Sequence, residues 1–308
     1  MFIYKNYDIL TFGSLQLKIK NGVILMNLKF TKMHGCGNDY IYIDCINNNV
    51  KFNVKDVAVK LSDRHFGVGS DGVVLILPSN ENEADVLMRM YNADGSEGKM
   101  CGNAIRCVAK YVYENNIAKK DILKIETLSG IKTIELIKNE HNKISAAKVN
   151  MGRADFSVES MPLKTSKKEI VDEPVSVDGK YYKITCISMG NPHCVVFVDD
   201  VNGLDVNCIG EKFQHINIFK DEFNIEFVNI ISKNEVNMRV YERGSKETLA
   251  CGTGACATVA AMVKNSYCSF GDIVLVNLLG GTLKVCCEKD RIYMTGEAKK
   301  VFTGEIDI

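Results

Sequence analysis

Apolar residues along this chain gather into short runs rich in β-branched residues, separated by glycine, asparagine, aspartate and proline. Runs of this length and composition, bounded by turn-forming residues, predict β-strands. In the first half of the chain, the predicted strands are residues 40–46, 72–78, 85–92, 123–130, 131–137 and 144–152. In the second half, they are residues 181–190, 194–200, 225–232, 236–244, 272–278 and 291–296. The pattern therefore predicts a chain rich in β-structure.

Three segments carry apolar residues at helical spacing instead. Residues 54–64 follow Asn53, a residue type that caps helix N-termini, and residues 103–115 and 254–265 form the other two predicted helices. The apolar faces of these last two helices are Ile105, Val108 and Val112, and Ala255, Val259, Met262 and Val263, respectively. Because the helices interrupt the strands irregularly and do not alternate with them, the pattern favours an α+β fold over a doubly wound sheet.

The second and third predicted helices are preceded by two similar turns. The stretches "DGSEGKMCGNAIRC" and "RGSKETLACGTGAC" share a Gly-Ser pair, a glutamate and a Cys-Gly pair in the same order. Their leading cysteines, Cys101 and Cys251, are 251 − 101 = 150 residues apart. Each turn follows a predicted strand, so the sequence predicts a duplicated unit of strand, loop and helix.

Composition narrows the possible classes of protein. A length of 308 residues allows about two ordinary domains. The formal net charge of +0 provides no field that would attract nucleic acid or an anionic membrane, and no apolar run reaches the roughly 18 residues that a membrane helix needs. The first 25 residues lack the features of a secretory signal, and the twelve cysteines are scattered, which is typical of a reducing cytoplasm. Composition therefore indicates neither a nucleic-acid partner nor a membrane-spanning protein.

The position of Cys101 and Cys251 at predicted helix starts suggests their chemistry. The first turn of a helix offers unpaired N–H groups and the positive end of the helix dipole, which stabilise a thiolate and lower the pKa of a cysteine below about 8.5. The following residues, Gly102 and Gly252, let a carboxylate approach the backbone. Two such sites flanking one carbon could remove a proton from one face and return a proton to the other.

Other interpretations remain open on the residues alone. Each turn holds a second cysteine, Cys107 or Cys256. Paired zinc ligands are usually separated by two to four residues; Cys107 lies beyond that range, and Cys256 lies at its upper limit. A metal-binding, Cys-rich protein is therefore one alternative. A redox disulfide is another, although the chain has no Cys-x-x-Cys motif. The lead cysteines could also be small residues that only begin helices. We predict packing roles for Cys107 and Cys256.

Five ordered motifs carry a family resemblance: "MHGCGNDYIYID", "DRHFGVGSDGV", "NADGSEGKMCGNAIRC", "GNPHCVVFV" and "RVYERGSKETLACGTGAC". Together they resemble diaminopimelate epimerase, over a region from about Met26 to the C-terminus. Proline racemases and hydroxyproline epimerases share the paired cysteines but do not combine these motifs. The resemblance implies a cofactor-independent isomerase, with no metal and no pyridoxal phosphate, that interconverts LL- and meso-diaminopimelate in lysine and cell-wall precursor biosynthesis.

The same resemblance implies the architecture. We expect two pseudo-symmetric domains, each a curved sheet wrapped on a central helix, with the active site in the cleft between them. The N-terminal domain would comprise residues 27–148 and 297–308 and carry Cys101, and the C-terminal domain would comprise residues 149–296 and carry Cys251. Residues 1–25 would be an N-terminal extension. The last strand is expected to return to the N-terminal domain. The resemblance also implies a cytoplasmic homodimer with a small-molecule substrate, and the net charge and hydropathy predict that it binds neither nucleic acid nor membrane.

The motifs also assign residues. Cys101 and Cys251 match the acid–base pair of the family, and His193 and Glu242 match residues that tune these cysteines. The substrate-binding positions of the family match Asn38, Asn92, Gly102, Asn103, Asn191, Asn224, Glu242, Arg243, Gly252 and Thr253. Amide side chains combine a donor and an acceptor, and an arginine can grip a carboxylate through two parallel hydrogen bonds, which suits a substrate that is zwitterionic at both ends.

One position departs from the family pattern. Some members have a glutamine contact where this chain has Gly72, and we expect that contact to be lost or to be replaced by Ser70 or the backbone. Two alternatives to the predicted activity are a proline- or hydroxyproline-type racemase and a non-catalytic metal-binding protein. A substrate screen distinguishes the first, because a cyclic imino acid has no distal zwitterion, and metal analysis distinguishes the second.

Overall fold

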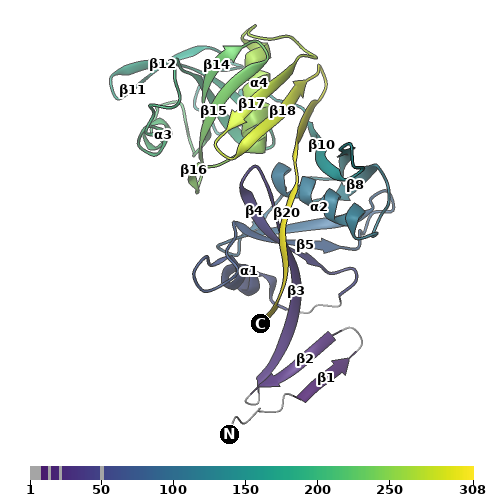
Figure 1. Cartoon of the computed structure of the whole chain (residues 1–308). Helices are drawn as coiled ribbons and strands as arrows, with labels where there is room; N and C mark the ends of the chain where they lie inside the picture. Colours follow the sequence, from purple (N-terminus) through teal and green to yellow (C-terminus); the bar gives the residue numbers. More distant parts are fainter. Residues whose placement is uncertain (1–7, 13–14, 21–22, 49–51) are drawn as a thin grey trace. The chain divides into compact units, whose positions relative to one another are not determined.

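The computed structural model describes residues 8–12, 15–20, 23–48 and 52–308 (Figure 1). Its contacts divide the chain into two compact units. Unit 1 comprises Met1–Gly35, Asp39–Thr133 and Ala298–Ile308, and unit 2 comprises Cys36–Asn38 and Ile134–Glu297. Each unit combines a mainly antiparallel sheet with helices, which confirms the predicted two-domain α+β fold class.

Unit 1 holds β1 (Asp8–Phe12), β2 (Leu15–Lys20), β3 (Val23–Gly35), β4 (Asn38–Asp44), α1 (Val54–Ser62), β5 (Gly72–Leu77), β6 (Val86–Asn92), β7 (Glu97–Gly98), α2 (Gly102–Glu114), β8 (Ile122–Glu126) and β20 (Lys299–Asp307). Strand β4 pairs with β5 in parallel, β5 with β6 and β6 with β7 antiparallel, and β6 with β8 in parallel. Strands β1, β2 and β3 form an antiparallel meander.

The predicted helices of unit 1 form as expected. Asn53 caps α1, since its side chain accepts a hydrogen bond from the backbone N–H of Lys55. The predicted apolar face of α2 is fully buried at Ile105, Val108 and Val112, and the helix packs against β3 and β8. Helical spacing of apolar residues thus correctly identified the side of α2 that forms the core.

The two ends of unit 1 are joined by a long-range strand pair. Strand β20 runs antiparallel to β3, from Lys299 opposite His34 to Asp307 opposite Asn27, and the two lie side by side in Figure 1. The backbone groups of the last strand are therefore satisfied by a strand near the opposite end of the sequence. This pairing confirms that the final strand returns to the N-terminal domain.

Unit 2 holds β9 (Lys132–Lys138), β10 (Ile144–Gly152), a short 3₁₀ helix (Val158–Ser160), β11 (Glu173–Val177), β12 (Lys180–Ser188), β13 (Pro192–Phe197), α3 (Val206–Gln214), β14 (Asn224–Ser232), β15 (Glu235–Glu242), β16 (Lys246–Thr248), α4 (Gly252–Lys264), β17 (Ile273–Leu278), β18 (Gly281–Cys287) and β19 (Ile292–Glu297). The strand order across the sheet is β11–β12–β13–β14–β15–β17–β18–β19–β10–β9.

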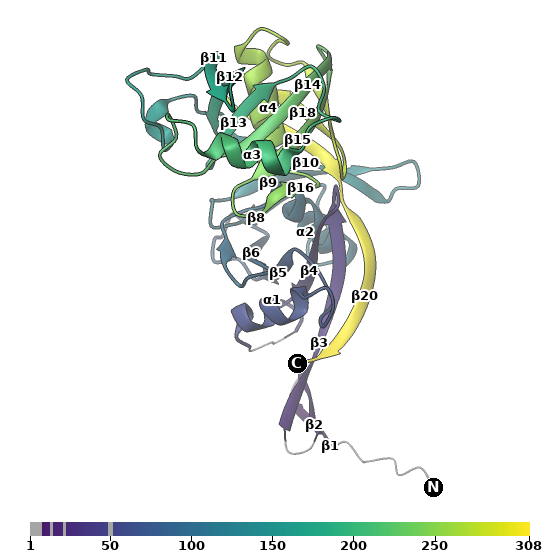
Figure 2. The same cartoon turned by 90° about the vertical axis from the view of Figure 1, so that its left-hand side faces the viewer.

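Helix α4 is the central element of unit 2. It contacts β12, β13 and β14 on one part of the sheet and β18 and β19 on another, so that the sheet curves around it (Figure 2). Its residues from Ala255 to Met262 are all buried. A helix that is apolar nearly all round can only be stable inside such a wrapping. Among the described residues, no helix is long and apolar enough to cross a membrane.

The duplication extends further than the sequence predicted. In unit 1 the order is β4, α1, β5, β6, β7, α2, β8, and in unit 2 it is β13, α3, β14, β15, β16, α4, β17. The strand pairs also agree in sense, because β13 pairs with β14 and β15 with β17 in parallel, whereas β14–β15 and β15–β16 are antiparallel. The two lead cysteines therefore occupy equivalent places in two copies of one folding pattern.

Three features differ from the sequence prediction. Helix α3 was not predicted, although Asp205 caps it by accepting a hydrogen bond from the N–H of Cys208. Strand β10, which the predicted boundary at 148/149 divided, forms six residue pairs with β19, and these hydrogen bonds group the β9–β10 hairpin with unit 2. Of the expected extension at residues 1–25, the structure describes β1, β2 and the start of β3, and residues 1–7, 13–14 and 21–22 lie outside the described residues.

Candidate active site

Cys251 is the N-cap residue of α4, where the chain changes from an extended conformation to a helix. Its sulfur accepts a hydrogen bond from the backbone N–H of Gly254 at 3.3 Å and lies 3.5 Å from the hydroxyl of Thr253. Its residue exposure is only 5 %. The sequence prediction that this cysteine begins a helix is confirmed, and the backbone donors of the helix start are directed towards its sulfur.

Two further polar side chains are buried next to Cys251. His193 on β13 and Glu226 on β14 are both fully buried, and the Nδ1 atom of His193 lies 2.6 Å from the Oε1 atom of Glu226. One donor atom from each of His193, Glu226 and Cys251 lies within 4.8 Å of the other two. The other carboxylate oxygen of Glu226, Oε2, has no hydrogen-bond partner among the described residues. The sulfur therefore faces a compact imidazole–carboxylate pair.

The backbone of α4 is adapted to this cluster at Gly254. A Cβ atom at this position would lie 2.6 Å from the Oε1 atom of Glu226 and 3.2 Å from the sulfur of Cys251. Both distances are shorter than ordinary contacts, so a side chain here would displace the carboxylate or the sulfur. The second glycine of "CGTGAC" thus permits the close approach of Glu226 to the start of the helix.

The surroundings of Cys251 reverse one sequence expectation. We expected the helix start to lower the pKa of both lead cysteines, but the pKa of Cys251 is raised well above its usual value. Burial is the main cause, and the nearby carboxylates of Glu242 and Glu226 add to it, whereas the hydrogen bonds from Thr253 and Gly254 act in the opposite direction. Desolvation and two like charges outweigh the helix terminus, and Cys251 is held as a thiol.

The same cluster offers ligand types that zinc accepts: an imidazole nitrogen, a carboxylate oxygen and a sulfur. Two ligands of one tetrahedral zinc ion lie about 3.3 Å apart, given zinc–ligand bonds of about 2.0 Å. The 2.6 Å separation between His193 and Glu226 is instead that of a short hydrogen bond. The geometry therefore fits a hydrogen-bonded pair better than a metal centre.

In unit 1, Cys101 is the N-cap residue of α2 and is half-buried. The residue that stands out near it is Arg106, which is fully buried inside the same helix. The guanidinium donates hydrogen bonds to the carbonyl of Gly102 at 2.9 Å and to the side-chain oxygen of Asn103 at 3.0 Å. The start of α2 therefore carries a buried cation, whereas the start of α4 faces the buried carboxyl group of Glu226.

The predicted substrate-binding residues of unit 2 lie close together around the ends of β13, β14 and β15. Asn224 is buried, and its side-chain oxygen accepts a hydrogen bond from the backbone N–H of Arg243 at 2.9 Å. Glu242 accepts a hydrogen bond from the hydroxyl of Thr248, and Asn191 contacts the Nε2 atom of His193 at 3.1 Å. The side chain of Arg243 is exposed.

Asn38 and Asn92 begin and end strands. Asn38 is the first residue of β4, and the turn before it belongs to unit 2, where Gly37 has a positive φ of 80° and packs closely against Leu249. Asn92 ends β6 in unit 1 and donates a hydrogen bond to the hydroxyl of Ser96 at 2.9 Å. Both residues are half-buried.

The position that departs from the family pattern, Gly72, has no room for a side chain. A Cβ atom there would lie 2.1 Å from the carbonyl oxygen of Tyr91 and 3.0 Å from the ring of Tyr40. Ser70, the expected replacement, is buried and donates its hydroxyl hydrogen bond to the carbonyl of Gly72 at 2.8 Å. Ser70 thus supports the backbone at this point.

The sequence analysis did not identify Glu226 or Arg106. The signal for Glu226 was a single charge within the apolar strand "NIEFV", and for Arg106 it was a charge next to the apolar face of "NAIRCVAKYV". A charged residue with apolar neighbours on both sides of a buried strand needs a partner inside the protein. That rule would have singled out Glu226, although it would not have named His193.

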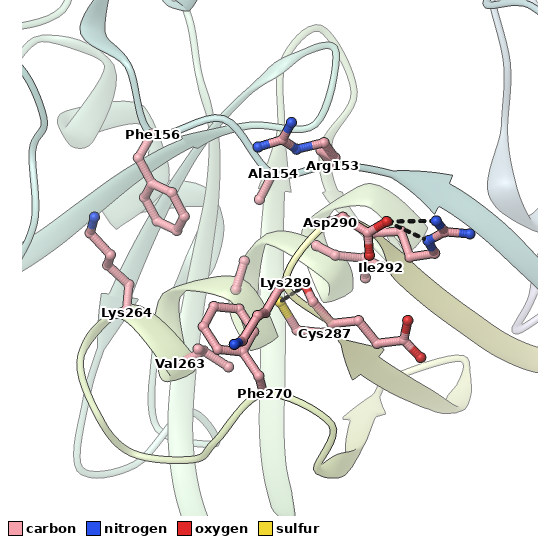
Figure 3. Close-up of a pocket in the computed structure, with 13 residues that line it drawn as sticks. Arg153, Ala154, Phe156, Val263, Lys264, Phe270, Cys287, Lys289, Asp290 and Ile292 are labelled. Atoms are coloured by element: carbon pink, nitrogen blue, oxygen red, sulfur yellow. Dashed lines mark hydrogen bonds and ion pairs between the residues drawn. The ribbon is translucent and has the colours of Figure 1, made fainter.

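A separate cavity of about 420 Å³ lies at the C-terminal end of α4 (Figure 3). Phe156, Val263 and Phe270 form apolar walls, and Lys264 and Lys289 are at its edge. The cavity lies at the opposite end of α4 from Cys251, and the predicted site residues do not line it. The predicted site residues thus lie at helix starts and strand ends, away from this cavity.

Comparisons with known proteins agree with this arrangement. The profile of the diaminopimelate epimerase family matches residues 30–157 and 185–301. The diaminopimelate epimerase of Acetivibrio thermocellus is 48 % identical over 283 residues, which cover 91 % of this chain and 99 % of that protein. The enzyme of the same name from Methanococcus maripaludis is 49 % identical over 283 residues, covering 91 % of this chain and all of that protein.

A likeness in fold reaches more distant proteins. The crystal structure of a hydroxyproline epimerase from Agrobacterium vitis has a TM-score of 0.65 with only 13 % identity, and the match covers 91 % of each chain. At that identity the likeness shows a shared fold alone. The family profile and the close relatives confirm the resemblance stated from the motifs: this chain belongs to the diaminopimelate epimerase family.

Proposed function

We propose that this protein is a cofactor-independent isomerase that interconverts LL- and meso-diaminopimelate by two-base proton transfer at the α-carbon, in lysine and cell-wall precursor biosynthesis. The observation that carries the proposal is the equivalent placement of Cys101 and Cys251 as N-cap residues of α2 and α4, in two copies of one folding pattern. Family membership supplies the substrate class.

The mechanism requires one thiolate and one thiol on opposite faces of the α-carbon. The thiolate removes the α-proton and becomes a thiol, and the other thiol gives its proton to the opposite face and becomes a thiolate. Backbone N–H groups at Gly102 and Asn103, and at Gly252 and Thr253, would bind the α-carboxylate and stabilise the negative charge that develops there. The overall charge is unchanged, and the configuration is inverted.

The surroundings of the two sulfurs support an assignment of roles. Burial, Glu242 and Glu226 favour the thiol form of Cys251, so in the resting protein Cys251 is the proton donor. Cys101 is then the base in the direction that begins from this state, and the roles exchange when the product leaves. His193 would act on the cysteines, and Glu242 would both act on the cysteines and contact the substrate.

The distal end of the substrate is proposed to bind to side chains around the strand ends. The four asparagines, Asn38, Asn92, Asn191 and Asn224, would provide paired donors and acceptors. Glu242 would accept from an ammonium group, and Arg243, whose side chain is exposed, would close on a carboxylate. A substrate without the distal amino acid would leave these groups unpaired, which predicts poor activity on proline.

The decisive test is substitution of each lead cysteine. C101A and C251A should each lose epimerisation by about 10³-fold or more, since each removes one of two obligatory proton carriers. The matched controls are C107A and C256A, which change the second, buried cysteine of each turn and should keep activity. Measurement is by separation of the LL and meso isomers, together with solvent deuterium incorporation. Near wild-type epimerisation in C101A or C251A would disprove the proposal.

Mild oxidation tests whether the two sulfurs can reach one carbon. Two sulfurs that flank a single carbon lie near enough to be joined by a disulfide, so oxidant should abolish activity and a thiol reductant should restore it. Peptide mapping of the oxidised protein should find Cys101 linked to Cys251. We also propose a cytoplasmic homodimer on the basis of the family, which sedimentation analysis of the purified protein would test.

A further inference from the structure

Glu226 is a buried carboxylate that is not among the predicted site residues. It is the third residue of β14, between Ile225 and Phe227, which are also fully buried. Its Oε1 atom contacts His193, and its Oε2 atom has no hydrogen-bond partner among the described residues. Leaving a charged oxygen unsatisfied in an apolar environment costs stability, so the residue is not explained by its contribution to the fold.

The equivalent position in unit 1 shows that the folding pattern does not need an acid here. The third residue of β5 is Val74, which is also fully buried. Both strands pair in parallel on one side and antiparallel on the other. A valine thus satisfies this position in unit 1, so the fold alone does not explain the glutamate in unit 2.

We propose that Glu226 is a positioning residue of the reaction proposed above, which fixes the ring of His193 and keeps the sulfur of Cys251 protonated. This inference rests on the proposed function for its catalytic meaning. The effect of Glu226 on His193 and Cys251 can nevertheless be measured in the absence of substrate.

The first part of the proposal, that Glu226 fixes the ring of His193, rests on the contact between the two side chains. At 2.6 Å the Nδ1 atom of His193 and the Oε1 atom of Glu226 form a short hydrogen bond, which fixes the orientation of the ring. The Nε2 atom then points to the side chain of Asn191, 3.1 Å away, a predicted substrate-binding residue. Glu226 thereby links the cysteine end of the cluster to the substrate end through His193.

The second part of the proposal, that Glu226 keeps the Cys251 sulfur protonated, depends on charge. The titratable groups that act on Glu226 or are acted on by it are His193 and Cys194 of β13, Glu242 of β15 and Cys251 at the start of α4. Burial raises the pKa of Glu226, and the charge and hydrogen bond of His193 act in the opposite direction and favour its carboxylate form. In its carboxylate form, Glu226 opposes formation of a second negative charge on the Cys251 sulfur.

The approach of Glu226 to the helix start is also built into the backbone. Gly254 is the residue that allows Oε1 to lie against the first turn of α4. The corresponding residue of α2, three positions after Cys101, is Ala104. A carboxylate at a helix N-terminus is stabilised by the helix dipole, so the charge on Glu226 is favoured by the same turn that holds Cys251.

Alkylation of Cys251 as a function of pH tests the charge effect. The probe is iodoacetamide, and mass spectrometry of the peptide containing Cys251 gives its rate in the C101A background and in C101A combined with E226Q. E226Q removes the negative charge and keeps the shape of the side chain, so the midpoint of the alkylation profile should move to lower pH. For each unit by which the pKa of Cys251 falls, alkylation at a pH below the midpoint should become about tenfold faster. E235Q, on neighbouring β15, is the matched control and should leave the profile unchanged.

E226D separates positioning from charge. The shorter side chain keeps the charge but withdraws it from His193, so the alkylation midpoint should stay high, whereas kcat should fall about tenfold or more with little change in KM. An unshifted midpoint in folded E226Q would overturn the charge effect, and wild-type kcat in E226D would overturn the positioning role. If E226Q does not fold, E226D alone still decides the positioning role. Failure of the proposed function would appear instead as activity in C101A or C251A.

Discussion

The two units use one folding pattern to create opposite surroundings for two cysteines. Helix α2 begins after Cys101 with a buried guanidinium, Arg106, bonded to its first turn. Helix α4 begins after Cys251 with a buried carboxylate, Glu226, against its first turn. A cation favours a thiolate and an anion favours a thiol, so the duplicated pattern suits a reaction that needs one of each.

The register of the parallel strand pairs β4–β5 and β13–β14 shows which residues of the two units correspond. In unit 1, Tyr40 is opposite Gly72, and in unit 2, His193 is opposite Asn224. Counting from these pairs, Val74 corresponds to Glu226. The polar cluster of unit 2 therefore arises from a few substitutions at matching positions on shared strands, which is how a repeated fold can acquire two different chemical sites.

Among the tests of this comparison, the largest effect on kcat is expected at the third residue of each helix, which is Gly254 in α4 and Ala104 in α2. G254A should reduce kcat about 100-fold or more, since the added Cβ would displace Glu226 or the Cys251 sulfur. Steady-state epimerisation and urea unfolding measure activity and stability separately. The reciprocal change, A104G, should only weaken α2, by about 1 kcal/mol. Equal loss of activity in both variants would mean that the difference between the two turns is unimportant.

Reactivity of the two cysteines should differ to a smaller extent. At neutral pH and in the absence of substrate, Cys101 should be alkylated about tenfold faster than Cys251. Cys101 is half-buried and precedes a helix whose first turn binds the guanidinium of Arg106, whereas burial and the carboxylates of Glu242 and Glu226 raise the pKa of Cys251. Quantitative peptide mapping after a short iodoacetamide pulse gives the ratio. Faster modification of Cys251 would reverse the proposed roles of donor and base.

The smallest effect should come from a pair of equivalent ion pairs. Arg89 contacts Glu97 in unit 1 at 2.6 Å, and Arg239 contacts Glu247 in unit 2 at 2.7 Å. The second pair is more buried, with side-chain exposures of 16 % and 17 % against 40 % and 24 %. E247Q should therefore cost about 1–2 kcal/mol and E97Q less than about 1 kcal/mol, as measured by hydrogen exchange within each unit.

The pH dependence of the weaker pair sharpens this test. The hydrogen bond from Arg89 holds the pKa of Glu97 below its usual range. A carboxylate with a lowered pKa in the folded state stabilises the protein above its unfolded pKa of about 4.3, and this contribution is lost as the pH falls through the folded value. The difference between E97Q and the wild type should thus vanish in acid. A difference that persists there would be due to packing and not to charge.

Local patterns were sufficient to predict much of the fold. The helical spacing of Ile105, Val108 and Val112 identified the buried face of α2, and Asn53 marked the start of α1 correctly. The two Cys-Gly turns predicted the equivalent helix starts. Helix α3 was missed because its short segment, "VNCIGEKFQ", has few apolar residues and its cap, Asp205, also suits a loop.

Pairings between distant segments could not be obtained in the same way. The hydrogen bonds of β10 to β19 join residues about 150 positions apart, and no local pattern specifies such a partner. The placement of the β9–β10 hairpin in unit 2 follows from that pairing. The same limit applies to the site, since Glu226 was visible as a charge in an apolar strand but its partner, His193, lies on another strand.

The sequence by itself determined the strand-rich α+β class, the duplicated turns that begin with Cys101 and Cys251, and the family, because spacing and motif order are local properties of the chain. Only the tertiary structure decided the protonation preference of Cys251. The effect of the helix start could be read from the sequence, but the stronger effects of burial and of carboxylates on β14 and β15 act through space. Their strength depends on distances that folding alone establishes.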